Sequence, residues 1–207
     1  MEGIQKTRGN GSATRPTAEM LERRDAVLKY WYGTTDINAD TKIEMNFELW
    51  FGGGPETDKA IVDQFKADVE KAARGEYFSW HNDPLSALAL VILMDQFSLN
   101  IYRDQPQGFE VSARAIPLAY TIVGRGFDKQ LPVLCRMFLY LPLEHSEEIV
   151  DQDVSVAWHK AGGVDPEYAV EHRDIVAKYG RFPGRNAVYG RESTAAEKEY
   201  LANGGVF

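Results

Sequence analysis

His145 stands between two carboxylates in the segment Glu144-His145-Ser146-Glu147. An unperturbed imidazole titrates near pH ~6.5, so a histidine oriented by a carboxylate can give or take a proton at neutral pH. We therefore take His145 as a candidate general acid or base, with Glu144 or Glu147 orienting it. Structural hydrogen bonding and metal binding remain alternatives for His145. Glu144 and Glu147 could also serve only as acidic residues in the first turn of a helix, where the helix dipole favours negative charge.

Three arginines occur in a stretch rich in glycine, residues 180–191. An arginine presents a planar fork of N–H groups to a carboxylate or phosphate, and each charge-assisted hydrogen bond contributes about 1.5–3 kcal/mol. The stretch therefore predicts a cradle for a small anion. The same arginines could instead pair inside the protein with Asp95, Glu144 or Glu147. The members of the predicted cradle are Arg181, Arg185, Asn186 and Arg191.

A second polar cluster, Asp95-Gln96…Asn100…Arg103, follows a very apolar run. On a continuous helix Gln96, Asn100 and Arg103 fall on one stripe, and Asp95 points elsewhere. An unpaired buried carboxylate or guanidinium would cost several kcal/mol, so Asp95 and Arg103 should each meet an opposite charge or a ligand. All four residues are therefore ligand-binding candidates. The alternative is that they tie this helix to its neighbours.

His172 shares a helical stripe with Tyr168 and Ile175, so its ring should face the interior. It is either a satisfied core histidine or a ligand-binding residue. The sequence has no HExxH motif and no Glu-x-x-His pair on two helices, so we predict no metal site. It also has no glycine-rich nucleotide loop, so no cofactor is predicted. His81 and His159 belong to no motif and are expected at the surface or at helix ends.

Apolar residues recur at helical spacing along most of the chain, and no alternating strand pattern of comparable length occurs. Thr17, Asp83-Pro84 and the pair Thr194…Glu197 are typical of helix starts. We therefore predict an all-α fold of seven to nine helices with short connections rich in glycine and proline. The expected helical segments are residues 17–31, 41–51, 55–74, 83–94, 109–123, 131–141, 144–161, 165–179 and a last one from 194.

Two of these segments carry further expectations. Residues 85–94 are apolar on every side, which indicates a central helix enclosed by others. The helix expected at 144–161 has an apolar stripe, and its opposite face should meet water, a cleft or a second protein. That stripe consists of Val150, Val154, Ala157 and Trp158, and the opposite face carries His145, Glu148 and Gln152.

Composition defines the class of protein. The 207 residues, 44% of them hydrophobic, fit one globular domain over residues 17–207, with residues 1–16 as a disordered tail. A formal net charge of -8 argues against nucleic acid as the main partner, because phosphate contacts need a basic face. The longest apolar run, Ala87–Met94, is too short to cross a bilayer. A single cysteine, Cys135, excludes an intrachain disulfide and favours a reducing compartment, and hence the cytoplasm.

Several motifs occur in one order: residues 85–97, Asn100-Ile101-Tyr102-Arg103, Leu141 to Glu147, and His172 followed by residues 180–197. Together they resemble the domain-of-unknown-function family numbered nine hundred and twenty-four. The resemblance spans about residues 20–202 and implies an all-α, tetratricopeptide-like antiparallel helical array with no assigned activity. Two departures stand out, because Ser98-Leu99 replaces the usual Pro-Arg pair and Gly184 replaces the usual histidine. If those family residues form a site, this chain has lost one cation and one imidazole from it.

Three functions remain open from the sequence. The first is a binding or scaffold protein whose helices hold a polar groove for a peptide or a small anion. The second is an enzyme in which His145 is the acid or base and Arg103, Arg181 or Arg185 holds a negative group of the substrate. The third is a purely structural helical protein. A second copy of the chain is a further partner left open, and neither nucleic acid nor membrane is expected. Every site prediction requires that distant side chains gather at one place.

Overall fold

The structure is a computed structural model that describes residues 15–205 and residue 207. Within these residues the chain forms nine helices, with Pro84–Ile101 counted as one continuous rod and the short turns left out, and it forms no strand. The all-α prediction and the predicted number of helices are therefore confirmed. The division into a tail and one domain stays a prediction, and residues 1–14 of that tail lie outside the described residues.

The main elements are α1 Ala18–Tyr32, α2 Pro55–Ala73, α3 Pro84–Val91, η3 Ile92–Phe97, α4 Ser98–Ile101, α5 Pro106–Ala113, α6 Ala115–Gly124, α7 Val133–Glu144, α8 Ile149–Gly162, α9 Glu167–Tyr179 and α10 Ala195–Ala202. Four short turns join them: η1 Glu48–Gly52, η2 Phe78–Asn82, η4 Asp128–Gln130 and η5 Pro183–Arg185.

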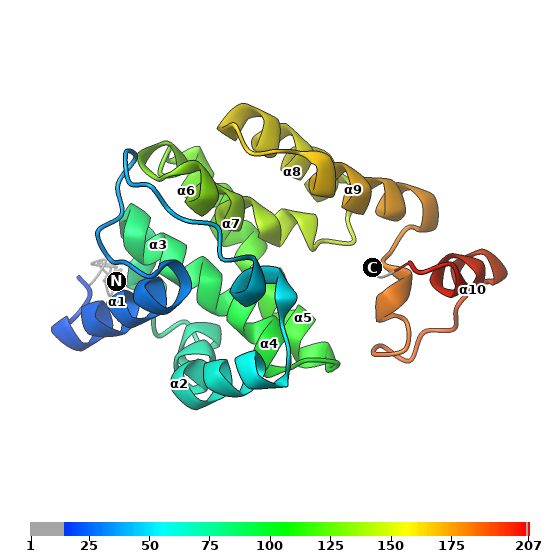
Figure 1. Cartoon of the computed structure of the whole chain (residues 1–207), viewed down its shortest axis with the longest axis horizontal. Helices are drawn as coiled ribbons and strands as arrows, with labels where there is room; N and C mark the ends of the chain where they lie inside the picture. The colour runs from blue at the N-terminus through cyan, green and yellow to red at the C-terminus, as the bar shows by residue number, and fades with distance from the viewer. Residues whose placement is uncertain (1–14, 206) are drawn as a thin grey trace, which may run out of the picture.

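The rod of α3, η3 and α4 is the centre of the core, with α1, α2, α5, α6 and α7 packed around it (Figure 1). The Asp83 carboxylate caps its first turn by accepting from the backbone N–H of Ser86 at 3.0 Å. Burial on all sides explains why the sequence of the rod is apolar throughout. By length and composition Pro84–Ile101 could pass for a membrane span, yet 72% of it is buried inside the protein, as in a core helix.

Local hydrogen bonds set the predicted ends of α1 and α10. Thr17 Oγ1 accepts from the backbone N–H of Met20 at 3.2 Å, and Gly33 ends α1 with a φ of 74°. Glycine adopts that left-handed conformation without strain. At α10 the Thr194 hydroxyl accepts from the N–H of Glu197, and the Glu197 carboxylate accepts from the N–H of Thr194. This is the predicted capping box.

Two expected helices are absent as single elements. Residues 41–51 contain only part of the π-helical turn η1 and one helical residue before it. The N–H of Asn38 donates to Thr41 Oγ1, and the N–H of Thr41 donates to the backbone oxygen of Asn38, so this stretch begins with a turn instead of a helix. The segment 109–123 is divided at Arg114 into α5 and α6. Pro117 lies in the first turn of α6, where its missing N–H breaks no intrahelical bond, so a new helix starts there.

The boundary between α7 and α8 also differs from the prediction. Helix α7 continues through Pro142 to Glu144, and α8 begins only at Ile149. The predicted faces of α8 are therefore wrong: Gln152 is fully buried, whereas Val150 is 68% exposed. The amide of Gln152 donates to the backbone oxygens of Glu144 and Ser146, both at 2.6 Å, and so closes the turn between the two helices.

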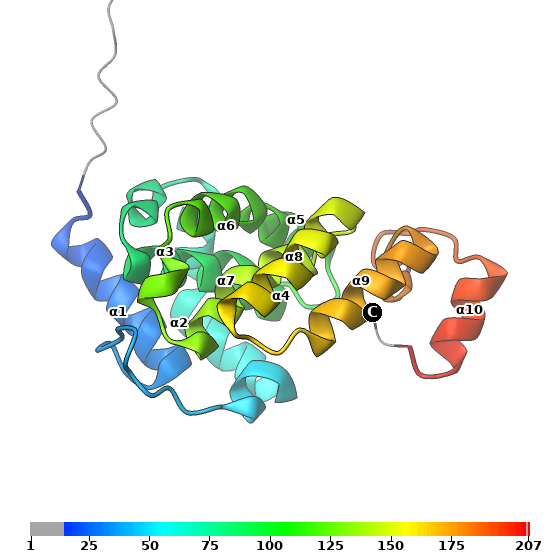
Figure 2. The same ribbon diagram turned by 90° about the horizontal axis from the view of Figure 1, so that it is seen from above.

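Helices α7, α8 and α9 pack consecutively against one another, and α1 and α10 lie at opposite ends of the elongated molecule (Figure 2). The segment between α9 and α10 returns toward the corner where α7 meets α8, and it brings the predicted arginine cradle with it. The tetratricopeptide-like arrangement stays a prediction, because consecutive packing alone does not define that repeat.

Close packing at the end of α8 gives a test of the core. A Cβ added at Gly162 would lie 2.6 Å from the hydroxyl oxygen of Tyr140, a buried side chain that donates to Asp128 at 2.9 Å. We expect Gly162→Ala to lower the free energy of unfolding by about 1–3 kcal/mol through overpacking, as measured by urea denaturation. Gly124→Ala is the control, since a Cβ there meets nothing within 4 Å. Equal stability of the two variants would contradict this packing.

Candidate functional site

Asp95 is fully buried in the π-helical stretch η3, a conformation that is frequent at functional sites. Its carboxylate accepts from Gln96 Nε2 at 2.5 Å, Ser112 Oγ at 2.5 Å and His145 Nδ1 at 2.9 Å. Gln96 belongs to the same rod, Ser112 to α5, and His145 follows α7. Three elements therefore converge on one buried carboxylate, whose partners satisfy it.

His145 directs Nδ1 at Asp95 and exposes 20% of its side chain. Because an ionised carboxylate can only accept, Nδ1 carries the proton of this bond. Burial opposes a positive charge on the ring most strongly, but Asp95 and Glu144 outweigh it, so the pKa of His145 is raised. No hydrogen bond joins Nε2 of His145 to any residue that the structure describes. The ring is thus fixed at one nitrogen and free at the other.

Arg185 contacts the backbone of His145, beside the pair formed by His145 and Asp95. Its Nη1 donates to the backbone oxygen of His145 at 2.9 Å. The central carbon of its guanidinium is 4.5 Å from the ring centroid of Phe109 and 4.4 Å from that of Phe182, so the group is held by two aromatic rings. Within residues 15–205 and 207, no carboxylate lies within 4.0 Å of Arg185. Burial lowers the pKa of Arg185 to about 10.

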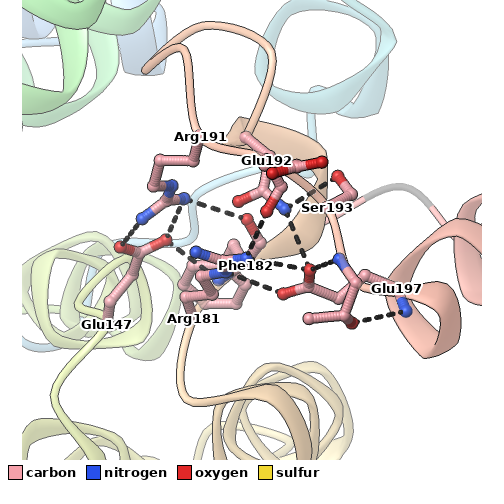
Figure 3. A network of polar contacts seen from close by, with 9 residues as sticks. Glu147, Arg181, Phe182, Arg191, Glu192, Ser193 and Glu197 are labelled. Carbon is pink, nitrogen blue, oxygen red and sulfur yellow. Dashed lines mark hydrogen bonds and ion pairs between the residues drawn. The ribbon is translucent and has the colours of Figure 1, made fainter.

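The other two arginines of the segment are paired with carboxylates on opposite sides of it (Figure 3). Arg191 donates from Nη1 and Nη2 to Glu147 at 2.7 and 2.9 Å. Arg181 donates from Nε and Nη2 to Glu197 at 2.7 and 2.9 Å. Both pairs have the two-pronged geometry in which arginine holds a carboxylate most specifically. These two arginines therefore serve the protein's own carboxylates.

The pKa values of the two carboxylates reflect these bonds. Hydrogen bonds from Arg181 lower the pKa of Glu197 to about 2. Burial tends to raise the pKa of Glu147, but the bonds from Arg191 and from the backbone N–H of Phe182 bring it below its usual value. Both groups are therefore ionised at neutral pH.

Asn186 belongs to the network around Glu197. Its Nδ2 donates to Ser193 Oγ at 3.0 Å and to Glu197 Oε2 at 3.3 Å. Its Oδ1 is buried and has no partner in the described part of the chain. Asn186 is thus placed at the predicted cradle, on the side of the paired Arg181 rather than beside Arg185.

Glu144 is buried at the end of α7, with 4% of its side chain exposed. Its Oε1 lies 3.4 Å from Nδ1 of His172, and its Oε2 lies 3.6 Å from Nε2 of His159. Burial, more than any other cause, raises the pKa of Glu144 to about 7. Burial also lowers the pKa of His172 to about 4 and lowers that of His159. His172 faces the interior as predicted. His159 lies in the last turn of α8, in keeping with the helix-end expectation, but it is buried rather than at the surface.

Two predicted site residues lie apart from this cluster. Arg103 is exposed and donates from Nε and Nη2 to Asp58 of α2 at 2.5 and 2.7 Å. Asn100 donates to the backbone oxygen of Gln96 and accepts from Arg103. These contacts tie the rod to α2, which is the structural alternative that the sequence left open.

Other residues of the cluster were not identified from the sequence. Phe109 and Ser112 lie on α5 and carry no motif, so only the fold places them beside Arg185 and Asp95. Glu197 was recognised only as a capping residue, although its position after the arginines gave a signal. His159 lies on the buried face of α8, which a misplaced helix start concealed.

A cavity between α9 and α10 does not coincide with these perturbed groups. This cavity has a volume of about 740 Å³, and its lining includes Tyr179, Tyr200 and Phe207 but neither His145 nor Arg185. The ring of Phe207 lies 3.9 Å from that of His172, so the cavity adjoins the cluster there. We take the cluster as the candidate site, because shifted pKa values, together with a half-buried arginine that has no carboxylate partner among the described residues, are typical of functional sites.

The bond between Asp95 and His145 predicts a change in titration. In Asp95→Asn the negative charge beside Nδ1 is gone, so the pKa of His145 should fall while burial continues to disfavour the charged ring. Proton NMR of the histidine ring across a pH titration measures this. Asp58→Asn, which removes a carboxylate near Arg103, should leave it unchanged. An unaltered His145 titration in Asp95→Asn contradicts the geometry.

The comparisons with known proteins agree with the fold. The family described as "Bacterial protein of unknown function" (DUF924) matches residues 27–205. The chain is similar to a solved protein of unknown function from Agrobacterium tumefaciens, with a TM-score of 0.79 and 30% sequence identity over 89% of this chain and 99% of that chain. No curated protein matches the chain. The family match covers most of the sequence, and the chain therefore belongs to the DUF924 family.

Proposed function

We propose that the protein binds a small anionic ligand at Arg185, beside the pair of Asp95 and His145. The observation that supports this is that two of three neighbouring arginines are paired with a carboxylate and the third is not, among the described residues. Arg181 and Arg191 each have a carboxylate in two-pronged contact, and Arg185 has none within the described residues. Taking a charge out of water costs several kcal/mol unless a counter-ion compensates it, so a half-buried guanidinium with no carboxylate partner among the described residues favours an anion from outside.

The free edge of Arg185 is suited to a carboxylate or to one face of a phosphate or sulfate group. Nη1 is used by the backbone oxygen of His145, and Nε and Nη2 have no hydrogen-bond partner in residues 15–205 and 207. Two adjacent N–H groups on a planar fork match two oxygens of one anion. Phe109 and Phe182 hold the fork in place, which lowers the entropy lost when a ligand binds.

The compartment is part of the same proposal. Cys135 is fully buried, and burial raises the pKa of its thiol to about 12. Such a thiol is inert toward exchange, and a single unpaired cysteine suits a reducing compartment. We place the binding function in the cytoplasm.

Acid–base catalysis on the bound ligand is a second candidate. A specific observation favours it, because Asp95 fixes Nδ1 of His145 while Nε2 stays unpartnered among the described residues. A histidine that is oriented by a buried carboxylate and free at its other nitrogen is the arrangement that general bases use. Binding remains the first proposal, since Arg185 supports it without requiring any reaction.

Anion binding predicts a thermal shift. Acetate, sulfate and citrate, each compared with chloride at equal ionic strength, should raise the melting temperature of the wild-type protein. A ligand at 100 times its dissociation constant adds about 2.7 kcal/mol to the free energy of unfolding. In Arg185→Met the anion effect should disappear, because the only unpaired guanidinium of the cluster is gone. Differential scanning fluorimetry measures both.

The control is Arg173→Met, which removes an exposed arginine that pairs with Asp153 and Asp174 on the outer face. This variant should keep the full anion effect. Equal shifts in wild type and Arg185→Met would place any bound anion elsewhere. Without added anion, Arg185→Met should be close to wild type in stability, since it removes a buried charge together with one hydrogen bond.

Catalysis predicts a separate pattern. In a panel of carboxylate- and phosphate-bearing esters, any substrate that the protein hydrolyses should show a rate that rises with pH as His145 loses its proton. His145→Gln should abolish the rate but only weaken the anion-induced thermal shift, because Arg185 is unchanged. Loss of both properties, with an intact fold, would mean that His145 contributes to binding instead.

A further inference from the structure

Glu144 differs from every other carboxylate of the cluster. Asp95 accepts from three side chains, and Glu147 and Glu197 are each paired with an arginine. In the described residues no arginine or lysine lies within 4.0 Å of Glu144, and its buried Oε2 has no hydrogen-bond partner. A buried carboxyl without a cation is more stable with a proton than without one.

The two histidines next to Glu144 each donate the Nδ1 proton to a backbone oxygen. Nδ1 of His159 is 2.9 Å from the backbone oxygen of Ser155, and Nδ1 of His172 is 2.8 Å from that of Tyr168. A carbonyl oxygen only accepts, so both Nδ1 atoms are donors and a neutral His159 presents a lone pair at Nε2. This lone pair faces Oε2 of Glu144 across 3.6 Å. When Glu144 is ionised, its Oε2 and the Nε2 of His159 are both hydrogen-bond acceptors. A proton on Oε2 makes it a donor that can face the lone pair of Nε2.

The charged groups around Glu144 determine how strongly its carboxyl holds this proton. Burial disfavours ionisation of Glu144, Asp95 and Glu171 oppose its negative charge, and His145 favours that charge when protonated. His159 and His172 are kept neutral chiefly by burial and so offer little compensation. These groups lie in η3 (Asp95), after the end of α7 (His145), in α8 (His159) and in α9 (Glu171 and His172). Arg185, in the segment after α9, acts on the neighbouring rings of His145 and His172, where its charge disfavours a second positive charge.

We propose that Glu144 is the proton-binding group of the anion site, so that an anion binds at Arg185 when Glu144 is neutral and is released when Glu144 ionises. This inference rests on the anion binding proposed above. His145 connects the two positions, because it follows Glu144 in the chain and its backbone oxygen accepts from Arg185. The ligand class is a small anion, and its binding draws a proton from solvent onto the carboxyl.

The charge balance of the cluster gives the reason. With Glu144 neutral and His145 protonated, the positive groups outnumber the ionised carboxylates by one, which leaves a single charge for a monoanion. Ionised Glu144 supplies that negative charge from within the protein. The positive groups are Arg181, Arg185, Arg191 and His145, and the carboxylates are Asp95, Glu147 and Glu197.

The test compares anion affinity in wild type and Glu144→Gln at several pH values between about 5.5 and 8.5, with sulfate and acetate as probes because their charges are constant there. Glutamine keeps the shape and a donor but cannot ionise. Wild-type affinity, from isothermal titration calorimetry, should fall on the order of tenfold across neutral pH, since one charge is added nearby in a medium of intermediate dielectric. Glu144→Gln should keep the high affinity and lose most of this dependence.

Asp63→Asn is the control, because Asp63 is an exposed carboxylate on α2 that pairs with Lys59 and is not among the groups that shift the pKa of Glu144. It should titrate like wild type. If Glu144→Gln keeps the wild-type pH dependence, the dependence belongs to His145 and the proposal is overturned. If neither probe binds wild type at any pH, the anion site itself is refuted, and the link to Glu144 falls with it.

A measurement without ligand distinguishes failure of the proton-binding role of Glu144 from failure of anion binding at Arg185. Carbon NMR of the labelled Glu144 carboxyl should show titration near 7 rather than near the ordinary 4.5. Because its pKa is raised in the folded protein, wild-type stability should fall relative to Glu144→Gln as pH rises from about 4.5 to about 7. An ordinary carboxyl titration would overturn the proton-binding role even if sulfate binds at Arg185.

Discussion

The candidate site depends on the carboxylate of Glu147, which holds the segment that follows α9 in place. Glu147 accepts from Arg191 at one end of that segment and from the backbone N–H of Phe182 at 2.9 Å at the other. Arg185 lies between these two anchors and is pressed against Phe109 without a carboxylate of its own. The paired charges on either side fix the position of Arg185, which is half-buried and keeps Nε and Nη2 free of hydrogen-bond partners among the described residues.

The fold was predictable where the signal was local. Asp83, Thr194 and Gly33 each act within one turn of their own residue, so capping chemistry read from the sequence placed those helix ends correctly. The prediction was wrong where tertiary packing decided the outcome. The sequence predicts a helix that ends at residue 141, yet the residues around Pro142 are buried and α7 continues through it to Glu144, so the predicted faces of α8 are wrong. A helix start misplaced by a few residues rotates every side chain on that helix.

For the candidate site, the sequence predicted which side chains lie close together better than it predicted which of them are bonded to each other. Residue type and spacing identified Asp95, His145 and Arg185, and the fold does bring them together. The sequence could not tell which arginine is paired, because a guanidinium matches any carboxylate within reach and the partners are distant in the chain. Arg103 illustrates the limit: its stripe on the rod is real, but α2 supplies Asp58 to it at the surface. Phe109 gave no signal, since aromatic residues are usually core anchors.

A crystal structure of the protein soaked in sulfate tests the central claim most directly. The account predicts a sulfate within hydrogen-bond distance of Nε or Nη2 of Arg185, while Arg191 and Arg181 remain on Glu147 and Glu197. A carboxylate of the protein itself on that edge of Arg185, with no sulfate beside it, would contradict the account.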